Sequence, residues 1–329
     1  MKKIISIPLK ILGWLVSILL ALVLLVFVGE KIVYGSFFFG GAKIEMAIPG
    51  LWSSYVPQGF DRIDDDTYLM SAYDKGEELP SVIFVMDGDE TIKCELYTAE
   101  DTPYLSHVGG VTHFDKYVYI ANDTGDYENF TTTCDMFLLE DVMKGKAKVI
   151  DSIEIPNRLA YCSVYDGKLY TGAFYREGSK YVTPESHQLQ TPAGDQNTAL
   201  MMVYTLGEDG KPVSSTPDRI YSTLSNVQGM CLTDSGKIVL STSWGLSTSQ
   251  LYVHDETKAA KGTFDFNGTD VELIYLDSAS LTQTVACPPM AEELVYQNGR
   301  VYILTESASM KYIFGKIMSG NFVHSYPIA

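Results

Sequence analysis

Polar and aromatic residues recur at two kinds of position in this chain, each beside a short β-rich run. The first kind precedes or opens a first run and comprises Gln58, His107, Gln228, Glu292 and Glu293. The second kind follows a second run and comprises Tyr73, Asp74, Asn122, Asp123, Tyr175, Arg176, Trp244 and Glu306. Amides and carboxylates can hydrogen-bond a ligand, and aromatic rings can stack on it or bury its apolar surface. These residue types are typical of a binding site, provided that the fold brings them together.

A catalytic arrangement is less apparent than a binding one. The chain has five histidines and no Gly-x-Ser-x-Gly, Walker or dinucleotide-binding motif. His107 could exchange a proton with Glu292 or Glu293 if these residues face one channel together. His113 and His254 fall within expected strands, where a structural role is the ordinary interpretation. The sequence therefore assigns no catalytic residue.

The densest group of side-chain oxygens lies in residues 122–128, which include Asp123 and Asp126. Calcium takes six to eight oxygen ligands from carboxylates, amides and carbonyls. We expect Asp123, Asp126 and Glu293 to be the candidate ligands if calcium binds. The stretch is not the twelve-residue calcium loop, and a solvated acidic turn is the favoured alternative.

Charge and cysteine content exclude two other classes of site. The first 40 residues hold four lysines and one glutamate, which leaves 20 basic and 40 acidic residues in the remainder. Such a surface repels nucleic acid and anionic lipid and suits cationic partners. Solubility alone also explains an acidic surface. The five cysteines form no Cys-x-x-Cys pair, so their spacing does not indicate zinc. Their odd number also argues against a complete set of disulfides.

The elements that must position these residues recur along the chain. Apolar runs with turn residues before them occur at residues 68–71, 117–120, 169–172, 238–241 and 301–304. Each is the second strand of a short antiparallel meander, and such units at intervals of about 40 to 50 residues are typical of a β-propeller. We predict an all-β propeller of five blades. A sixth could be contained in the long third or fourth unit.

Two features complete the predicted ring. The strand at residues 43–48 is expected to close the ring against the last unit, which removes an open sheet edge. The third unit carries an insertion at residues 176–198, and such loops are typical of lids, binding loops or disorder. The fourth unit is expected to extend from residue 227 to about residue 276.

Blade connectivity predicts where the candidate residues lie. In an antiparallel blade, the start of the first strand and the end of the second lie at the same end of the sheet. The two kinds of candidate residue should therefore surround one end of the central channel. Loops held by a rigid scaffold commonly carry function. The alternative is that innermost strands are polar because the channel contains water.

The first 40 residues are expected to form a unit separate from the propeller at residues 41–329. Three lysines precede residues 11–28, an uncharged apolar run long enough to span a bilayer. A cleaved signal peptide is the alternative, but its apolar region is usually shorter, and no clean cleavage site follows. We predict a single-pass cell-membrane protein with its N-terminus inside and the bulk of the chain outside.

At the unit openings and Asp-Gly turns, the chain resembles bacterial extracytoplasmic propellers of the gluconolactonase, strictosidine-synthase-like and YncE-like groups. The resemblance covers about residues 50–328 and implies a propeller fold. In gluconolactonase-like enzymes a Glu-Gly-Pro opens the first blade, and its glutamate binds the metal. This chain has Gln58-Gly59-Phe60 and Gln228-Gly229-Met230 at the matching places. The substitution of glutamine argues against lactonase activity.

Two functions of different class follow from these observations. The first is a surface module that binds or senses a small ligand, glycan or peptide, or a protein partner, through the loop-rich end of the channel. The second is a calcium-dependent hydrolase or lactonase that acts in the channel. It would need a metal cage, which Asp123, Glu292 and Glu293 could supply. Binding is favoured, because it needs no catalytic arrangement.

Overall fold

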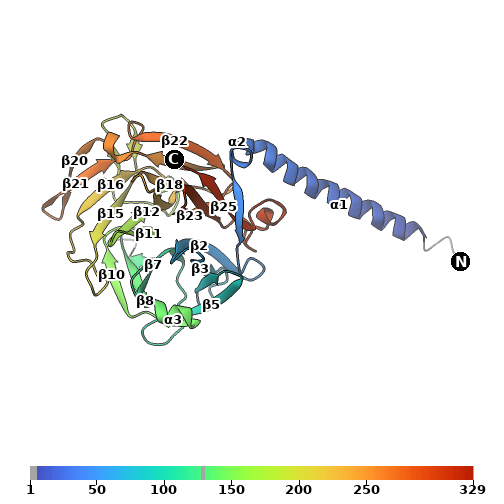
Figure 1. The fold of residues 1–329 in the computed structure, drawn as a ribbon, viewed down its shortest axis with the longest axis horizontal. Coiled ribbons are helices and arrows are strands. Elements are labelled where there is room, and N and C mark those ends of the chain that lie inside the picture. Colours follow the sequence, from blue (N-terminus) through green and yellow to red (C-terminus); the bar gives the residue numbers. More distant parts are fainter. Residues whose placement is uncertain (1–5, 127–129, 329) are drawn as a thin grey trace.

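The computed structural model describes residues 6–126 and 130–328 of the chain. Five antiparallel blades surround a central axis, and a long helix extends sideways from the edge of the ring (Figure 1). The predicted all-β propeller of five blades is thus confirmed, and the long third and fourth units do not hide a sixth. Each blade exposes two apolar faces, so it depends on its neighbours to bury them.

The blades follow the order of the chain, and each begins with its innermost strand. Blade 1 contains β2 (Tyr55–Arg62), β3 (Thr67–Asp74), β4 (Val82–Asp87) and β5 (Glu90–Tyr97). Blade 2 contains β6 (Val108–Phe114), β7 (Tyr117–Asp126), β8 (Thr131–Leu138) and β10 (Asp151–Ile155). Blade 3 contains β11 (Leu159–Tyr165), β12 (Lys168–Ala173), β15 (Ala199–Thr205) and β16 (Arg219–Thr223). Blade 4 contains β17 (Val227–Leu232), β18 (Ile238–Thr242), β19 (Ser249–His254) and β22 (Leu281–Cys287).

Blade 5 joins the two ends of the propeller. It contains β23 (Ala291–Gln297), β24 (Arg300–Thr305), β25 (Phe322–Pro327) and, as its outermost strand, β1 (Lys43–Ala47). Strand β1 pairs antiparallel with β25, with Lys43 opposite Ser325 and Ala47 opposite Phe322. The predicted closing strand is therefore confirmed. Closure pairs one edge of the last blade, which would otherwise be open to other chains.

Two insertions add strands to the blade that precedes them. Strand β9 (Lys146–Lys148), which follows helix α3 (Leu139–Met143), pairs parallel with β5 of blade 1. The hairpin of β20 (Lys261–Phe266) and β21 (Thr269–Tyr275) pairs parallel with β16 of blade 3. The expected end of the fourth unit near residue 276 was therefore wrong. Its last strand is β22, because the preceding hairpin belongs to the neighbouring sheet.

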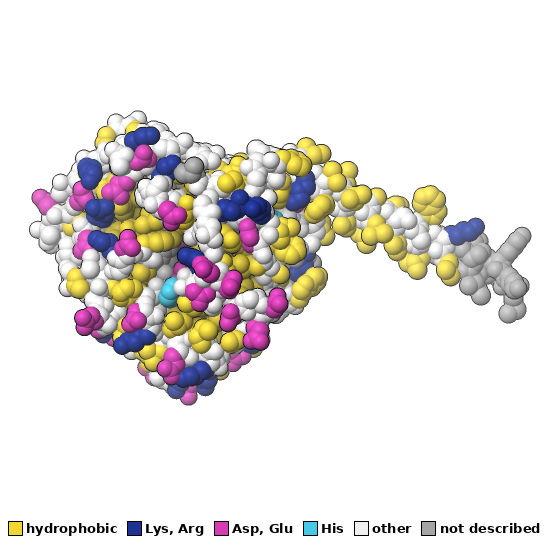
Figure 2. Space-filling model, in the orientation of Figure 1, with side chains coloured by type: hydrophobic (Ala, Val, Ile, Leu, Met, Phe, Trp, Pro, Cys, Tyr) yellow, Lys and Arg dark blue, Asp and Glu magenta, His cyan; other side chains and the backbone are white. Residues whose placement is uncertain are grey.

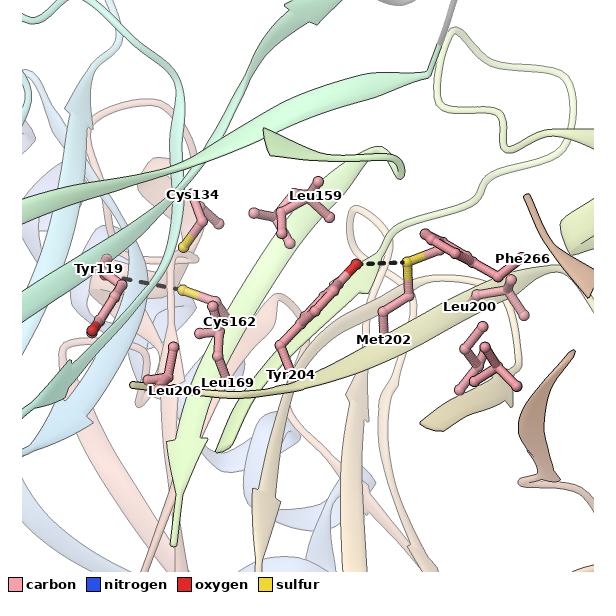
Figure 3. Packing of buried hydrophobic residues seen from close by; sticks show 14 of the residues in the cluster. Tyr119, Cys134, Leu159, Cys162, Leu169, Leu200, Met202, Tyr204, Leu206 and Phe266 are labelled. Atoms are coloured by element: carbon pink, nitrogen blue, oxygen red, sulfur yellow. Dashed lines mark hydrogen bonds between the residues drawn. The ribbon is translucent and has the colours of Figure 1, made fainter. Parts of the chain in front are cut away.

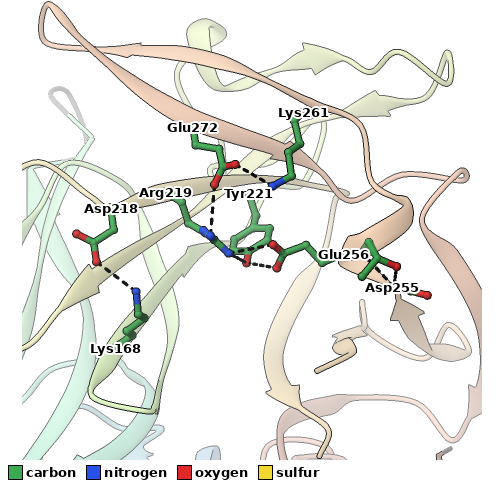
Figure 4. A network of polar contacts seen from close by, with 9 residues as sticks. Lys168, Asp218, Arg219, Tyr221, Asp255, Glu256, Lys261 and Glu272 are labelled. Atoms are coloured by element: carbon green, nitrogen blue, oxygen red, sulfur yellow. Dashed lines mark hydrogen bonds and ion pairs between the residues drawn. The ribbon is translucent and has the colours of Figure 1, made fainter. Parts of the chain in front are cut away.

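Charged side chains fasten this hairpin to blade 3. Arg219 on β16 contacts Glu272 on β21 at 3.3 Å and Glu256 at 2.9 Å, as Figure 4 shows. Lys261 also contacts Glu272, at 2.8 Å. Glu256 lies in the short 3-10 helix η2 (Glu256–Lys258), so that the network joins three segments. A shared guanidinium of this kind fixes geometry better than an isolated surface ion pair.

Apolar side chains fill the spaces between adjacent blades. Between blades 2 and 3, Tyr119, Met136, Leu169 and Met202 are fully or almost fully buried, and Figure 3 shows part of this cluster. All five cysteines are buried and unpaired, as expected for small apolar side chains. Burial on both faces explains why the central strands are apolar runs rather than alternating ones.

The N-terminal helix α1 (Ser6–Val33) is followed by the single-turn helix α2 (Gly35–Phe38). Among the described residues, α1 is the one helix long and apolar enough to cross a membrane, and its apolar part is not buried by the propeller. At about 1.5 Å per residue it is about 42 Å long, which exceeds the thickness of a hydrocarbon core. Figure 2 shows its hydrophobic side chains exposed along its length.

Candidate functional site

An irregularity in pairing repeats at the opening of all five innermost strands. The register shifts between Pro57 and Phe60 in β2 and at the corresponding places in the other blades. The intervals in the other four strands are Val108–Val111, Leu159–Tyr161, Val227–Gly229 and Ala291–Leu294. A bulge bends the strand and re-aims the side chains within it. Of the residues inside the five bulges, Gln58, Gly109, Gly110, Ala160, Gln228 and Glu292 line one cavity.

Glycine occupies several bulge positions because the innermost strands almost touch. A Cβ atom on Gly109 would lie 2.0 Å from the backbone oxygen of Ala160 in the next blade. A Cβ atom on Gly59 would lie 2.3 Å from the backbone nitrogen of Val111. Neither neighbouring atom can move aside as a flexible side chain could, since both belong to the backbone. The glycines in the Gln-Gly and Gly-Gly pairs therefore allow close packing around the channel.

The bulges form part of the wall of a cavity of about 360 Å³. Its lining comes from all five blades: Gln58, Tyr73, His107, Gly109, Gly110, Arg158, Ala160, Phe174, Tyr181, Gln228, Ser243, Trp244, Gly245, Glu292, Glu306, Lys311 and Tyr312. The volume falls within the range of small-molecule sites. Six of these residues lie in the five bulges, and most of the others follow the ends of second strands.

Two carboxyl groups and two amides face one another in the cavity. The amide nitrogen of Gln58 donates to Glu306 Oε2 at 3.1 Å, and that of Gln228 donates to Glu292 Oε1 at 3.3 Å. Burial raises the pKa of Glu306 to about 7. Burial first, and then the nearby charge of Glu306, raises the pKa of Glu292 well above its usual value. Near neutral pH this pair therefore holds less negative charge than two carboxylates would.

Aromatic side chains line the side of the cavity formed by blades 3 and 4. Trp244 and Phe174 have ring centroids 6.1 Å apart, and Tyr181 lies edge-on to Phe174 at 5.5 Å. Trp244 is 39% exposed, so its ring is accessible to a ligand. The guanidinium of Arg158 lies 4.8 Å from the centre of the Tyr181 ring. Tyr181 belongs to the insertion between β12 and β15, so this insertion contributes to the cavity.

A compact group from blades 1, 2 and 5 forms another part of the wall. The rings of His107 and Tyr73 have centroids 4.0 Å apart, and Lys311 Nζ donates to the Tyr73 hydroxyl at 2.5 Å. Burial lowers the pKa of His107 to about 4, and the charge of Lys311 adds to this effect. His107 is therefore neutral near pH 7. In that state it offers the cavity one donor and one acceptor rather than a positive charge.

The structure brings seven of the eleven residues predicted to bind ligand into the cavity wall. These are Gln58, Tyr73, His107, Gln228, Trp244, Glu292 and Glu306. The other four are not part of this wall. Asp74 accepts from the backbone nitrogens of Glu78 and Leu79, and Asn122 is buried and donates to Asp135. Tyr175 is not among the lining residues, and neither is Arg176, although the Arg176 guanidinium lies 5.0 Å from the centre of the Trp244 ring.

Several lining residues carried no sequence signal. Arg158 precedes β11, Tyr181 lies in the insertion, and Lys311 and Tyr312 lie five and six residues beyond Glu306. Only the aromatic and basic composition of these loops could have suggested them. Their place in the cavity depends on how each loop folds back over the channel.

The candidate metal ligands do not form a common site in the part of the chain that the structure describes. Glu293 is buried below the cavity, where its Oε1 accepts from the Met230 backbone nitrogen at 2.7 Å. Burial raises the pKa of Glu293 well above its usual value. The side chains of Asp123 and Asp126 are outside those described. Among the described residues, no group of three or more His, Cys, Asp or Glu side chains could hold a metal ion.

No family model and no curated protein matches the chain. Solved structures similar to it include the PQQ-bound aldose sugar dehydrogenase of Streptomyces coelicolor, with 13% identity and a TM-score of 0.49 over 86% of this chain and 96% of that one. A xylose-bound GH43_1 enzyme of Xanthomonas citri has 12% identity and a TM-score of 0.41 over 86% and 90%. Such values carry no assignment of activity or ligand. The gluconolactonase, strictosidine-synthase-like and YncE-like groups are not confirmed, and the resemblance stands at the level of a propeller.

Proposed function

We propose that this chain is a membrane-anchored propeller outside the cell that binds a small, neutral, polyhydroxylated ligand, such as a saccharide, in the channel cavity. The observation that carries the proposal is the mixed composition of the cavity wall. Part of the wall presents carboxyl and amide groups, and a neighbouring part presents the ring of Trp244 backed by Phe174. A sugar ring has both kinds of surface, with hydroxyls at its edge and an apolar face.

The cavity wall carries charged groups of both signs, which favours hydroxyl groups over a ligand of one strong charge. Arg158 and Lys311 provide positive charge, and Glu292 and Glu306 share less than two negative charges near neutral pH, which leaves a positive excess. A strongly anionic ligand would meet the two glutamates, and a strongly cationic one would meet Arg158 and Lys311. Hydroxyl groups can donate to the carboxyls and accept from the amides and the cations, so they can hydrogen-bond with the acceptors and with the donors of the wall.

The anchor rests on the helix α1 and on the charges beside it. The helix is long enough to cross a bilayer, and lysines precede its apolar run. The excess of lysine before the helix favours an N-terminus inside the cell and a propeller outside it. A cleaved signal sequence would have the same composition. An uncleaved anchor is distinguished from it by the presence of Trp14 in the mature chain.

A titration with defined sugars tests the binding proposal. Glucose, xylose, galactose, N-acetylglucosamine and their disaccharides would be titrated into the full chain in detergent micelles by calorimetry, with choline as a cationic comparator. We expect at least one sugar to bind and Trp244→Ala to weaken it about tenfold, which corresponds to about 1.4 kcal/mol for a lost stacking partner. Trp52→Ala, outside the cavity, is the matched control and should leave the affinity unchanged.

Binding of choline without any sugar would overturn the proposed ligand class, and binding of neither would overturn the proposal as a whole. A second candidate function, hydrolysis of the bound sugar, is favoured by one observation. A carboxyl with a pKa of about 7 beside a second carboxyl is suited to general acid catalysis. Release of monosaccharide from a bound disaccharide by the wild-type chain, abolished in Glu306→Gln, would support it.

A further inference from the structure

A cluster of exposed apolar side chains lies beside the C-terminal end of α1, outside the candidate site. Trp52 is 81% exposed, Phe314 55% and Ile317 39%. Trp52 lies in the loop before β2, and the other two lie in the 3-10 helix η3 (Ile313–Ile317) between β24 and β25. We refer to these three residues as the apolar patch.

Lys316 joins the two loops that carry the patch. Its Nζ lies 4.2 Å from the centre of the Trp52 ring, and it donates to the backbone oxygen of Leu51 at 2.5 Å. The same amine donates to the backbone oxygen of Ala308 at 2.6 Å. The patch is therefore held in place by the fold, although its apolar side chains face solvent.

A buried carboxylate of the helix α1 connects the helix to the segment that carries the patch. Glu30, in the last turn of α1, is 3% exposed and accepts from the Ser319 backbone nitrogen at 3.0 Å and from its hydroxyl at 2.6 Å. Ser319 comes two residues after η3. Below Glu30, Phe37 of α2 is 1% exposed and stacks on Tyr326 of β25 at 5.3 Å. These contacts fix the direction in which the helix leaves the propeller.

The segments at this edge are poorer in acidic residues than the rest of the propeller. Residues 31–54 and 307–321 contain four lysines and one acid, Glu45, which accepts from the Ser325 hydroxyl, although the chain beyond residue 40 holds 40 acids. Trp, Phe and Lys are residue types that proteins place at the boundary between lipid headgroups and acyl chains.

We propose that the apolar patch inserts into the lipid interface beside the anchor, so that the propeller rests on the membrane by the edge of blade 5. This inference rests on the proposed anchor. The C-terminal part of α1 contacts η3, which carries two of the three patch residues, and the Glu30–Ser319 contact prevents the propeller from turning freely about the helix. The patch side chains are therefore expected to contact lipid.

The orientation has a consequence for the cavity. The loop from Glu306 to Ser319 contributes Glu306, Lys311 and Tyr312 to the cavity and carries Phe314 and Ile317 to the patch. The loop with Trp52 enters β2 at the end of the ring where Gln58 faces the cavity. Both loops leave the propeller on the cavity side. The cavity then opens beside the membrane surface rather than far from it.

The chain's three tryptophans provide the test, because each lies in a different place. Trp14 is in α1, Trp52 is in the patch and Trp244 is at the cavity. Three full-length variants would each retain one of them, with Trp→Phe at the other two positions. Each would be reconstituted into phosphatidylcholine–phosphatidylglycerol vesicles that carry a nitroxide either at the headgroup or deep in the acyl chain. Tryptophan emission would then be compared with that in unlabelled vesicles.

We expect the headgroup nitroxide to reduce Trp52 emission at least about twofold, since interfacial side chains lie within about 5 to 10 Å of the headgroup–acyl boundary. Trp244 should be quenched by neither nitroxide, and Trp14 by at least one. In the chain that retains Trp52, Phe314→Glu should reduce the quenching. Val213→Glu, at a side chain 66% exposed on blade 3, should not.

The outcomes separate the patch from the anchor and from the cavity. If Trp14 is quenched but Trp52 is quenched no more than Trp244, the proposed insertion of the patch is overturned and the anchor is retained. Absence of quenching at Trp14 would overturn the anchor and, with it, the patch. Neither result bears on sugar binding, which the titration in micelles measures separately.

Discussion

Replacement of Glu306 by glutamine tests the electrostatic description of the cavity. The substitution removes one negative charge but retains an oxygen that can accept from Gln58. In the folded chain burial raises the pKa of Glu306 to about 7 from a usual value of 4.5. The folded state therefore binds the proton more tightly than the unfolded state, and wild-type stability should fall as pH rises from about 4.5 to about 7.

The magnitude follows from the same two values. The interval from 4.5 to about 7 corresponds to about 3 kcal/mol as an upper bound. Water in the open cavity screens the charge, so we expect about 1 to 2 kcal/mol. Glu306→Gln should therefore match the wild type at pH 4 and exceed it by this amount at pH 8. In a propeller of this size the gain corresponds to an increase in Tm of about 2 to 6 °C.

Thermal unfolding of the full chain in micelles, followed by circular dichroism at pH 4 and pH 8, measures the difference. Glu154→Gln, on the exposed face of β10, is the matched control and should show no such pH dependence. If Glu306→Gln lowers Tm equally at both pH values, then Glu306 acts as a hydrogen-bonding residue without a raised pKa. In that case the argument that Glu292 and Glu306 hold less than two negative charges near neutral pH fails.

Two further predictions concern packing. Gly109→Ala should destabilise the chain by more than about 2 kcal/mol because its Cβ would lie 2.0 Å from the Ala160 backbone oxygen. Gly262→Ala in β20 is the control: its Cβ meets only the movable ring of Tyr275, so it should cost less than about 1 kcal/mol. Similar losses of stability in urea unfolding of the two variants would contradict the close packing of the inner strands. Phe37→Ala should cost about 3 to 5 kcal/mol through the cavity it leaves, and no change in Tm would show that α2 is not part of the propeller core.

Much of the fold could be predicted because its signals are local. Apolar runs of strand length, separated by Gly and Asp turns, specify a meander, and repetition of the meander specifies a ring. The strand β1 could be assigned to the last blade because a ring leaves one edge to close. The β20–β21 hairpin could not be placed, since its pairing with β16 is parallel and depends on residues about 50 positions apart.

The sequence by itself determined which end of the channel carries the polar groups. Blade connectivity places strand openings and second-strand ends together, and Gln58, Gln228, Glu292 and Glu306 lie there as expected. Only the tertiary structure decided which side chains enter the cavity. The bulges turn Gln58 and Glu292 toward the cavity, and the conformation of the loop after β24 brings in Lys311. Asp74 instead accepts from the backbone nitrogens of Glu78 and Leu79. A register shift or loop path depends on contacts between distant segments, and no local pattern records it.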